Sequence, residues 1–236
     1  VTRLSRHHLK SLPRDVRRPS YDRAAVRAGV VHLGIGAFHR AHQAAIFEES
    51  LNAGDLRWGI IAASLRSPAV RDQMAPQDGL YTMLVRDGSA DRAQVIGAVR
   101  QVIVAPEDPE ALLAALTAPD THIVTLTVTE KGYKLDPATG GLIEGDAQVA
   151  ADLVSLKAPQ TAPGYLVAAL ARRKKEGLTP FTAISCDNLP HNGQRLRGAV
   201  LDLARRHDPA LADWIAAEGA FPETMVDRIV PATTAD

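Results

Sequence analysis

The apolar residues of this chain gather in short runs that are rich in valine, isoleucine and alanine and are bounded by turn residues. Continuous apolar runs of this length are typical of strands buried on both faces of a parallel sheet. Such runs predict strands at residues 30–33, 58–63, 122–128 and 180–186. Further strands are predicted at residues 80–85, 94–104 and 225–230.

Between these strands the apolar residues recur at the three- and four-residue spacing of an amphipathic helix. Helices are predicted over residues 41–51, 109–116, 162–175, 192–206 and 209–217. The alternation of strands with helices predicts an α/β fold of Rossmann type, in which helices flank a mostly parallel sheet.

Three polar segments lie outside this alternation. Residues 1–29 predict an irregular N-terminal arm with short turns. Residues 86–89 predict a turn between the strands at 80–85 and 94–104. Residues 136–141, Asp-Pro-Ala-Thr-Gly-Gly, predict a hairpin-like excursion, because glycine, proline and aspartate favour turns.

Composition narrows the classes of partner. The 236 residues carry 27 basic and 27 acidic side chains, so the net charge gives no reason to expect nucleic acid or an anionic membrane as partner. No apolar run approaches the ~20 residues of a membrane helix. The single cysteine, Cys186, fits a reducing compartment and is interpreted as a small buried residue. We therefore expect a cytoplasmic protein whose partner is a small molecule.

The segment Gly34-Ile35-Gly36-Ala37-Phe38 joins the first strand to the first helix. A first glycine allows a sharp turn there, and a second lets the backbone approach a pyrophosphate at the helix start. The third glycine of the dinucleotide-binding pattern is replaced by His39. A nucleotide site and a simple glycine turn both remain open on this pattern alone.

The end of the second strand bears on which dinucleotide is bound. An acidic residue about 20 positions after the glycines usually accepts the ribose 2′-hydroxyl of NAD. This chain has Ser64-Leu65-Arg66-Ser67-Pro68, and Asp55 precedes the strand, where it is expected to point away. Arg66 is open to three interpretations: an adenine contact, a 2′-phosphate contact or a surface arginine.

Histidines give little reason to expect a metal site. His39 and His42 lie three apart on the first helix, but two histidines without a third ligand are weak support for a metal. We expect no metal and interpret both side chains as packing or surface residues.

Two polar clusters follow predicted strands, at residues 125–133 and 185–193. Ligands of open α/β sheets gather beyond the carboxyl ends of the strands. Together with the glycine turn, these clusters predict one cleft. Thr125 and Thr127 are otherwise explained as strand formers, and Asn192 as a helix N-cap.

Taken together, the motifs resemble the polyol-specific long-chain dehydrogenases, a family that includes mannitol 2-dehydrogenase and fructuronate reductase. The resemblance covers the chain from about Leu4 onward and includes the histidine in the glycine turn. The motifs that carry it lie at residues 34–43, 127–133, 185–188 with 192–193, and 221–229.

The resemblance implies metal-independent hydride transfer between a nicotinamide and C2 of a hexitol or a related polyol acid. It implies that Asn188 is catalytic, donating a hydrogen bond to the developing oxyanion, and that Asn188 and Asp227 bind substrate. It implies a cofactor site lined by Gly34, Ile35, Gly36, Ala37, Phe38, Arg66, Thr129, Glu130 and Val226.

In this family a lysine general base lies in a second, mainly helical domain, which we expect to be missing from these residues. Residues 1–236 are accordingly interpreted as the N-terminal dinucleotide-binding domain. Lys131 belongs to the 127–133 motif and is interpreted as part of the cofactor wall. We expect this chain to bind nucleotide weakly without turnover, and a non-catalytic nucleotide-binding module is the alternative of another class.

The substrate and cofactor remain to be chosen within the family. The motif at residues 187–193 favours a hexitol such as mannitol as substrate, whereas the motif at residues 127–133 favours fructuronate. NAD is the expected cofactor, because the family mostly uses it. Pro68 and Ala69 stand where the family usually carries acidic residues, so NADP stays open.

Overall fold

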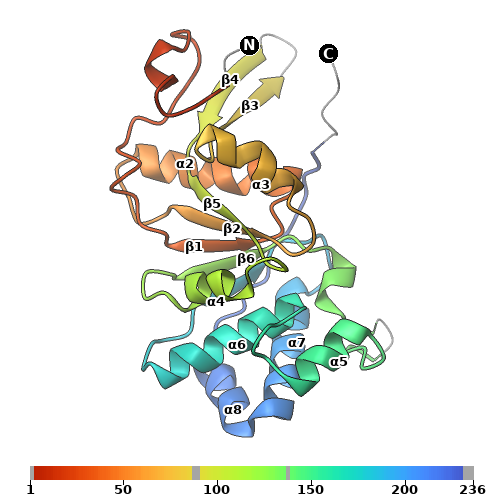
Figure 1. Ribbon diagram of the computed structural model, residues 1–236. Coiled ribbons are helices and arrows are strands. Elements are labelled where there is room, and N and C mark those ends of the chain that lie inside the picture. Colours follow the sequence, from red (N-terminus) through yellow and green to blue (C-terminus); the bar gives the residue numbers. More distant parts are fainter. Residues whose placement is uncertain (1–2, 87–90, 137–138, 231–236) are drawn as a thin grey trace.

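The computed structural model describes residues 3–86, 91–136 and 139–230 (Figure 1). A parallel five-stranded sheet in the order β5-β2-β1-β6-β7 forms its centre. Val30 of the central strand pairs with Ile60 on one side and with Ile123 on the other. The strands are β1 (Val30–Leu33), β2 (Ile60–Ser64), β5 (Val99–Val104), β6 (Ile123–Leu126) and β7 (Thr182–Ser185).

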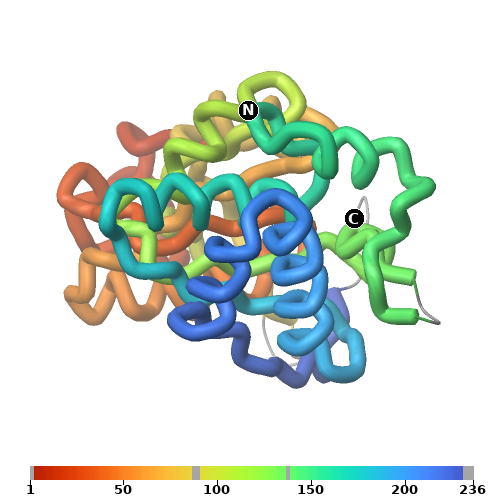
Figure 2. Tube along the Cα trace, turned by 90° about the horizontal axis from the view of Figure 1, so that it is seen from below, coloured from red at the N-terminus to blue at the C-terminus, as the bar shows by residue number. Residues whose placement is uncertain are grey.

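Helices cover both faces of this sheet, which confirms the predicted α/β fold. Val30 packs with α2 and α3 on one face, whereas Val31 packs with α4 and the helices beyond it on the other. Figure 1 shows α6, α7 and α8 below the sheet, and in Figure 2, which is seen from below, they lie in front of it. The helices are α1 (Ala37–Ala41), α2 (Gln43–Asn52), α3 (Ala69–Met74), α4 (Pro109–Thr117), α5 (Ala147–Val154), α6 (Ala162–Lys175), α7 (Asn192–His207) and α8 (Pro209–Glu218).

Local sequence fixes where several helices begin. The side chains of Asp108, Asp146, Thr161 and Asp208 accept hydrogen bonds from the first backbone N–H groups of α4, α5, α6 and α8. Gly177 has φ +71° just after α6, as a helix stop requires. Short 3-10 turns lie at η1 (Leu9–Ser11), η2 (Ala75–Gln77) and η3 (Glu130–Tyr133).

The prediction of one strand over residues 94–104 is wrong. The run is divided between β4 (Asp91–Ile96), which pairs with β3 (Tyr81–Arg86) in a separate antiparallel hairpin, and β5 of the main sheet. Gly97 separates them: a Cβ there would lie 2.7 Å from Pro19. Of the predicted turn at 86–89, residues 87–89 lie outside the described residues.

The prediction of a strand at 225–230 is also wrong, because the extended segment 221–230 pairs with no strand. Met225 is 92% exposed and Ile229 is 89% exposed. Helices α3 and α5 were not anticipated. The excursion at 136–141 is present as a turn in which Gly140 N donates to Asp136 O, although residues 137–138 lie outside the description.

The N-terminal arm, residues 3–29, is largely irregular, as predicted, and is fixed to the body by buried polar contacts. Tyr21 Oη donates a 2.8 Å hydrogen bond to the buried carboxylate of Glu48 on α2. The same carboxylate accepts from Gly97 N at 2.8 Å and from Asn52 Nδ2 at 3.2 Å. Glu48 thus joins the arm, α2 and the start of β5.

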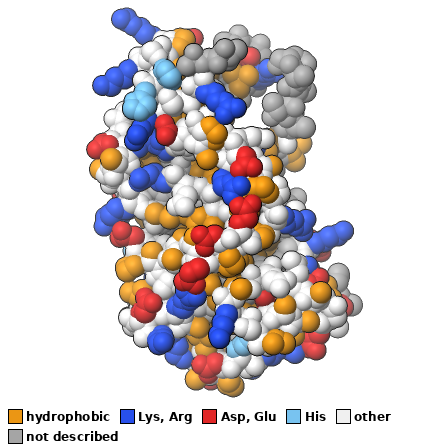
Figure 3. Space-filling model, viewed as in Figure 1, with side chains coloured by type: hydrophobic (Ala, Val, Ile, Leu, Met, Phe, Trp, Pro, Cys, Tyr) orange, Lys and Arg blue, Asp and Glu red, His pale blue; other side chains and the backbone are white. Residues whose placement is uncertain are grey.

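The surface carries both signs of charge intermingled, as the face in Figure 3 shows. Among the described residues, no helix is long and apolar enough to cross a membrane. Arg173, one of four consecutive basic residues at the end of α6, is buried: it is 3% exposed and donates to the carbonyl of Ala118 after α4.

Candidate functional site

The glycine turn lies where the strand order reverses, between β1 and β6. Gly34 has φ +98°, and a Cβ on it would lie 2.1 Å from the carbonyl oxygen of Thr127. Only glycine therefore fits this position. Thr127 Oγ1 donates a 2.7 Å hydrogen bond to Gly34 O and ties the ends of the two strands together. In open α/β sheets this switch point is the ligand-binding position.

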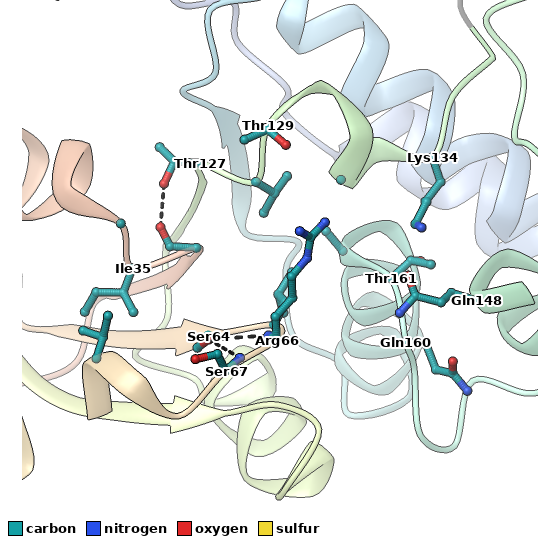
Figure 4. A pocket seen from close by; sticks show the side chains of 17 residues that line it. Ile35, Ser64, Arg66, Ser67, Thr127, Thr129, Lys134, Gln148, Gln160 and Thr161 are labelled. Atoms are coloured by element: carbon teal, nitrogen blue, oxygen red, sulfur yellow. Dashed lines mark hydrogen bonds between the residues drawn. The ribbon is translucent and has the colours of Figure 1, made fainter. Parts of the chain in front are cut away.

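A cavity of about 350 Å³ opens at this point, beyond the carboxyl ends of β1, β2 and β6 (Figure 4). Gly36 at its floor is exposed, and a Cβ there would meet nothing closer than Gly34 O at 3.8 Å. The space that a side chain would occupy is therefore free for a ligand. The cavity is lined by Gly34, Ile35, Gly36, Ser64, Leu65, Arg66, Ser67, Val70, Thr127, Val128, Thr129, Gly132, Lys134, Gln148, Gln160, Thr161 and Ala162.

The start of α1 adds hydrogen-bond donors beside the glycine turn. Ala37 and Phe38 open the helix, and their backbone N–H groups have no acceptor among the described residues. Their side chains do not line the cavity. Any contribution of these two residues to an anionic ligand is therefore made through the backbone.

His39, which stands in place of the third glycine, is completely buried. Its ring stacks on His32 of β1, with the centroids 3.5 Å apart and an interplanar angle of 11°. His32 in turn lies 2.8 Å from Thr125 Oγ1 and 3.0 Å from both Gly34 O and Thr127 Oγ1. The histidine therefore packs α1 onto the turn, where a glycine would have allowed a closer helix.

These histidines form no metal cluster with other ligands. Within the described ranges, His, Cys, Asp and Glu side chains come together in no group of three that would hold a metal ion. His39 packs inside the protein, and the Nε2 atoms of His39 and His42 are buried without a hydrogen-bond partner in the described part of the chain. Burial lowers the pKa of His39 to about 4, so its ring is neutral near pH 7.

The end of β2 brings Arg66 into the cavity. Ser64 Oγ accepts from the backbone N–H groups of Arg66 and Ser67 and so shapes this loop. Figure 4 shows the Arg66 side chain extending from the strand end toward Thr129. Asp55 lies elsewhere, paired with Arg57 at 2.7 Å, as expected from its place before the strand.

Opposite Arg66, the wall formed by residues 127–133 is held by Asp187. Its carboxylate accepts from the backbone N–H groups of Val128 at 3.0 Å and Thr129 at 2.9 Å, and from Tyr133 Oη at 2.6 Å. Burial, with the neighbouring carboxylate second, raises the pKa of Tyr133, which remains a hydrogen-bond donor. Thr129 has φ +66° and ψ 164°, a conformation costly for a non-glycine residue.

Other predicted site residues lie outside the lining of this cavity. Glu130 and Lys131 are exposed and do not line the cavity. Asn188 is exposed on the loop that follows β7, next to Asp187. Val226 is half-buried and Asp227 is exposed on the segment 221–230. The structure thus brings the glycine turn, Arg66 and Thr129 together in one cavity and leaves the remaining predicted residues outside its lining.

Asn192 anchors the segment 221–230 rather than capping α7, whose N-cap is His191. Its side-chain amide donates to Thr224 Oγ1 at 2.8 Å and its Oδ1 accepts from Thr224 N at 3.1 Å. Cys186 is half-buried, and burial raises the pKa of its thiol to about 11. The thiol is therefore protonated near pH 7, which disfavours a nucleophilic role.

Sequence reasoning missed the side of the cavity formed by α5 and the start of α6. Gln148, Gln160 and Thr161 line it, and Lys134 approaches it while paired with Asp146 at 2.7 Å. The helix predicted from residue 162 was the one local signal in this region. Nothing in the spacing of the glutamines indicated that they face a ligand.

A glycine turn at the switch point of a parallel sheet, with a cavity beyond the strand ends, defines a Rossmann-type nucleotide-binding domain. The family described as Mannitol dehydrogenase Rossmann domain matches residues 28–236. The chain therefore belongs to the mannitol dehydrogenase family.

Similar proteins fit this assignment. The chain is 45% identical over 226 residues to the uncharacterized oxidoreductase YeiQ of Escherichia coli (strain K12), covering 95% of this chain and 46% of that protein. It is 46% identical over 221 residues to mannitol 2-dehydrogenase of Phaeosphaeria nodorum (strain SN15 / ATCC MYA-4574 / FGSC 10173), covering 92% of this chain and 39% of that one.

A solved structure agrees in fold. Pseudomonas fluorescens mannitol 2-dehydrogenase, in a ternary complex with NAD and D-mannitol, superposes with a TM-score of 0.94 at 39% identity. The match covers 99% of this chain and 48% of that chain. This chain thus spans about half the length of the relatives it matches or less.

Proposed function

We propose that this chain is the nucleotide-binding domain, residues 1–236, of an NAD-dependent polyol oxidoreductase. The reaction is hydride transfer between the nicotinamide and C2 of a hexitol or ketose, as in the conversion of D-mannitol to D-fructose. The observation that carries the proposal is the open space at Gly36 beside the switch-point cavity, in a fold that matches a mannitol 2-dehydrogenase holding NAD and D-mannitol. A cytoplasmic location is part of the proposal.

The residues present fit a dinucleotide. The missing Cβ of Gly36 leaves room for a pyrophosphate, and the first N–H groups of α1 supply donors to it. Ile35, Arg66 and Thr129 line the cavity beside this position. Ala37, Phe38, Glu130 and Val226 complete the proposed cofactor site. When bound, NAD supplies the hydride acceptor.

On the substrate side, the protein's task is to place the alcohol and to stabilise its charge as the proton leaves. Asn188 is exposed next to Asp187 and is proposed to donate a hydrogen bond to the substrate oxygen. Asp227, exposed on the segment held by Asn192 and Thr224, is proposed to accept hydrogen bonds from substrate hydroxyls. Both side chains are exposed and so are accessible to a substrate.

The general base is proposed to be a lysine of a second, mainly helical domain. Two lysines lie near the cavity in the described part of the chain. Lys134 is paired with Asp146, and Lys131 is exposed outside the cavity lining. The proposal assigns the base to neither, so the 236-residue chain is expected to bind nucleotide without turnover.

The test compares two forms of the protein. NADH binding by the 236-residue chain is measured by fluorescence titration, and NAD-dependent oxidation of D-mannitol is measured on the longer protein that contains the helical domain. Asn188→Ala should lower kcat at least tenfold and leave the NADH dissociation constant within about twofold. Arg205→Ala, remote on α7, is the control.

Two results would overturn the proposal. Rapid mannitol oxidation by the 236-residue chain would show that the base lies within it. Reduction of fructuronate in place of mannitol oxidation by the longer protein would replace the substrate with a sugar acid.

A further inference from the structure

The charged groups of the cavity are unusual for a site that takes only NAD. Selectivity for NAD commonly depends on a carboxylate beside the ribose 2′-hydroxyl, at the end of the second strand. Among the described residues that line the cavity, none is acidic, and the charged ones are Arg66 and Lys134. The charge of Lys134 is matched by Asp146 at 2.7 Å.

Arg66 alone therefore carries an unmatched charge into this space. Its guanidinium makes no hydrogen bond or ion pair within the described ranges. Arg57 and Arg71, on neighbouring segments, do form salt bridges. Asp72 and Glu107, the acids near α3, are both bound to Arg71. In the part of the chain that the structure describes, neither of these carboxylates contacts Arg66.

The backbone around Arg66 is fixed in a way that suits an anion. Ser64 Oγ accepts from the N–H groups of Arg66 and Ser67, so the loop turns directly after β2. Ser67 Oγ accepts from Ala69 N at 3.2 Å and keeps its own O–H to donate. The loop thus presents a guanidinium and a hydroxyl that can donate at the strand end, and none of the described residues lining the cavity supplies the carboxylate that commonly accepts from a 2′-hydroxyl.

We propose that the end of β2 binds the 2′-phosphate of NADP(H), with Arg66 as the principal contact and Ser67 as a second donor, so that this protein takes both nicotinamide dinucleotides. The proposal rests on the nucleotide site proposed above and adds its specificity. A guanidinium beside a phosphate forms charge-assisted hydrogen bonds, whereas the same side chain beside a ribose hydroxyl gains much less.

The experiment titrates the 236-residue chain with NADH and with NADPH by fluorescence and compares the two dissociation constants. We expect the two to lie within about tenfold of each other. Arg66→Ala should weaken NADPH binding about tenfold or more and NADH binding less than about threefold. Ser67→Asp, which keeps an acceptor for Ala69 N, should weaken NADPH still further and spare NADH. Arg205→Ala removes the same charge at a remote exposed site and should change neither.

A competition series locates the phosphate contact. Adenosine 2′,5′-bisphosphate should displace NADPH at lower concentrations than 5′-AMP does. Arg66→Ala should remove this difference between the two competitors. Inorganic phosphate at the same concentrations should displace little, which separates a 2′-phosphate site from general anion binding.

The outcomes separate this inference from the proposed function. Tight NADH binding with no measurable NADPH binding would overturn the 2′-phosphate site and leave the proposed function intact. Equal weakening of both nucleotides by Arg66→Ala would make Arg66 an adenine contact instead. Binding of neither nucleotide would overturn both proposals for this chain, provided that circular dichroism shows it folded.

Discussion

The ring of His39 lies flat on the ring of His32, with 3.5 Å between the centroids and both side chains fully buried. This stack joins the first helix to the central strand directly beneath the glycine turn. Burial lowers the pKa of both rings, to about 4 for His39, so the folded protein keeps them neutral. Protonating either ring would bury a charge, and among the described residues the charged neighbour that acts on His39 is the cation Arg40.

The stack predicts a loss of stability on acidification. An unfolded histidine binds a proton below about pH 6.5, whereas folded His39 does not until about pH 4. The unfolded state therefore gains protons first. The free energy of unfolding falls by about 3 kcal/mol through His39 as the pH drops from 6.5 to 4. Urea denaturation at pH 7, 6 and 5 measures this slope.

His39→Phe provides the comparison, because phenylalanine keeps a flat ring on His32 and does not titrate. The unfolding free energy of the wild type minus that of His39→Phe should decrease as the pH falls, because only the wild type loses stability through His39. A difference that is constant from pH 7 to pH 5 would contradict a buried neutral His39.

The two glycines of the turn should respond differently to alanine. Gly34→Ala places a Cβ 2.1 Å from Thr127 O at φ +98°, and we expect a loss of at least about 3 kcal/mol of stability. Gly36→Ala meets open space and should change the unfolding free energy by less than about 1 kcal/mol.

NADH binding should be impaired by Gly36→Ala, although this substitution costs little stability. The methyl group of Gly36→Ala fills the space proposed for the pyrophosphate, so NADH affinity should fall about tenfold or more in a protein of normal stability. Thermal denaturation and fluorescence titration on the same samples measure both quantities. Normal NADH binding by Gly36→Ala would place the pyrophosphate elsewhere.

Asp187 is expected to matter for the shape of the cofactor wall. Asp187→Ala leaves the N–H groups of Val128 and Thr129 without their acceptor and releases a strained Thr129, so we expect a loss of about 2–4 kcal/mol and weaker NADH binding. Tyr133→Phe removes one hydrogen bond to the same carboxylate and leaves both backbone contacts in place. It should lower stability by about 1 kcal/mol and preserve NADH binding. Equal effects of the two variants on NADH affinity would contradict this role.

Glu48 is predicted to fasten the N-terminal arm. Its carboxylate accepts from Tyr21, Gly97 and Asn52, and glutamine would turn an amide N–H₂ toward one of these donors. Glu48→Gln should lower stability by about 1–3 kcal/mol and speed trypsin cleavage within residues 3–29.

The neighbouring Glu49→Gln is the matched control for Glu48. Glu49 pairs with Arg17 at an exposed site, where an ion pair contributes under about 1 kcal/mol. If both substitutions accelerated cleavage of the arm equally, the buried carboxylate would have no special part in holding it.

Patterns in the sequence predicted the parallel sheet and most of its helices, because a strand buried on both faces must be apolar throughout. They failed where a single residue changes the path of the chain. Residues 94–104 form a continuous run of strand-forming residues, but Gly97 packs against Pro19 and divides it between two sheets. The segment 225–230 has strand-like composition, yet it lies exposed without a neighbouring strand.

The candidate site was predictable to the extent that its residues are adjacent in sequence. The glycine turn follows a strand, so its place at a strand end could be inferred. The stack of His32 on His39 and the hydrogen bond that Asp187 accepts from Val128 N depend on tertiary packing, and sequence spacing alone does not show them. Arg66 was recognised as a choice between roles, and its direction into the cavity came from the structure.

The order of strands in the sheet also sets the order in which the cleft can be assembled during folding. The hydrogen bond between His32 and Thr125 joins residues 93 positions apart, and the one that Thr129 N donates to Asp187 joins residues 58 apart. Contacts this distant in sequence close large loops and form slowly, whereas the local β3–β4 hairpin forms early. During synthesis the cleft therefore stays open until Asp187 has emerged from the ribosome, and a nucleotide gains a complete wall only then.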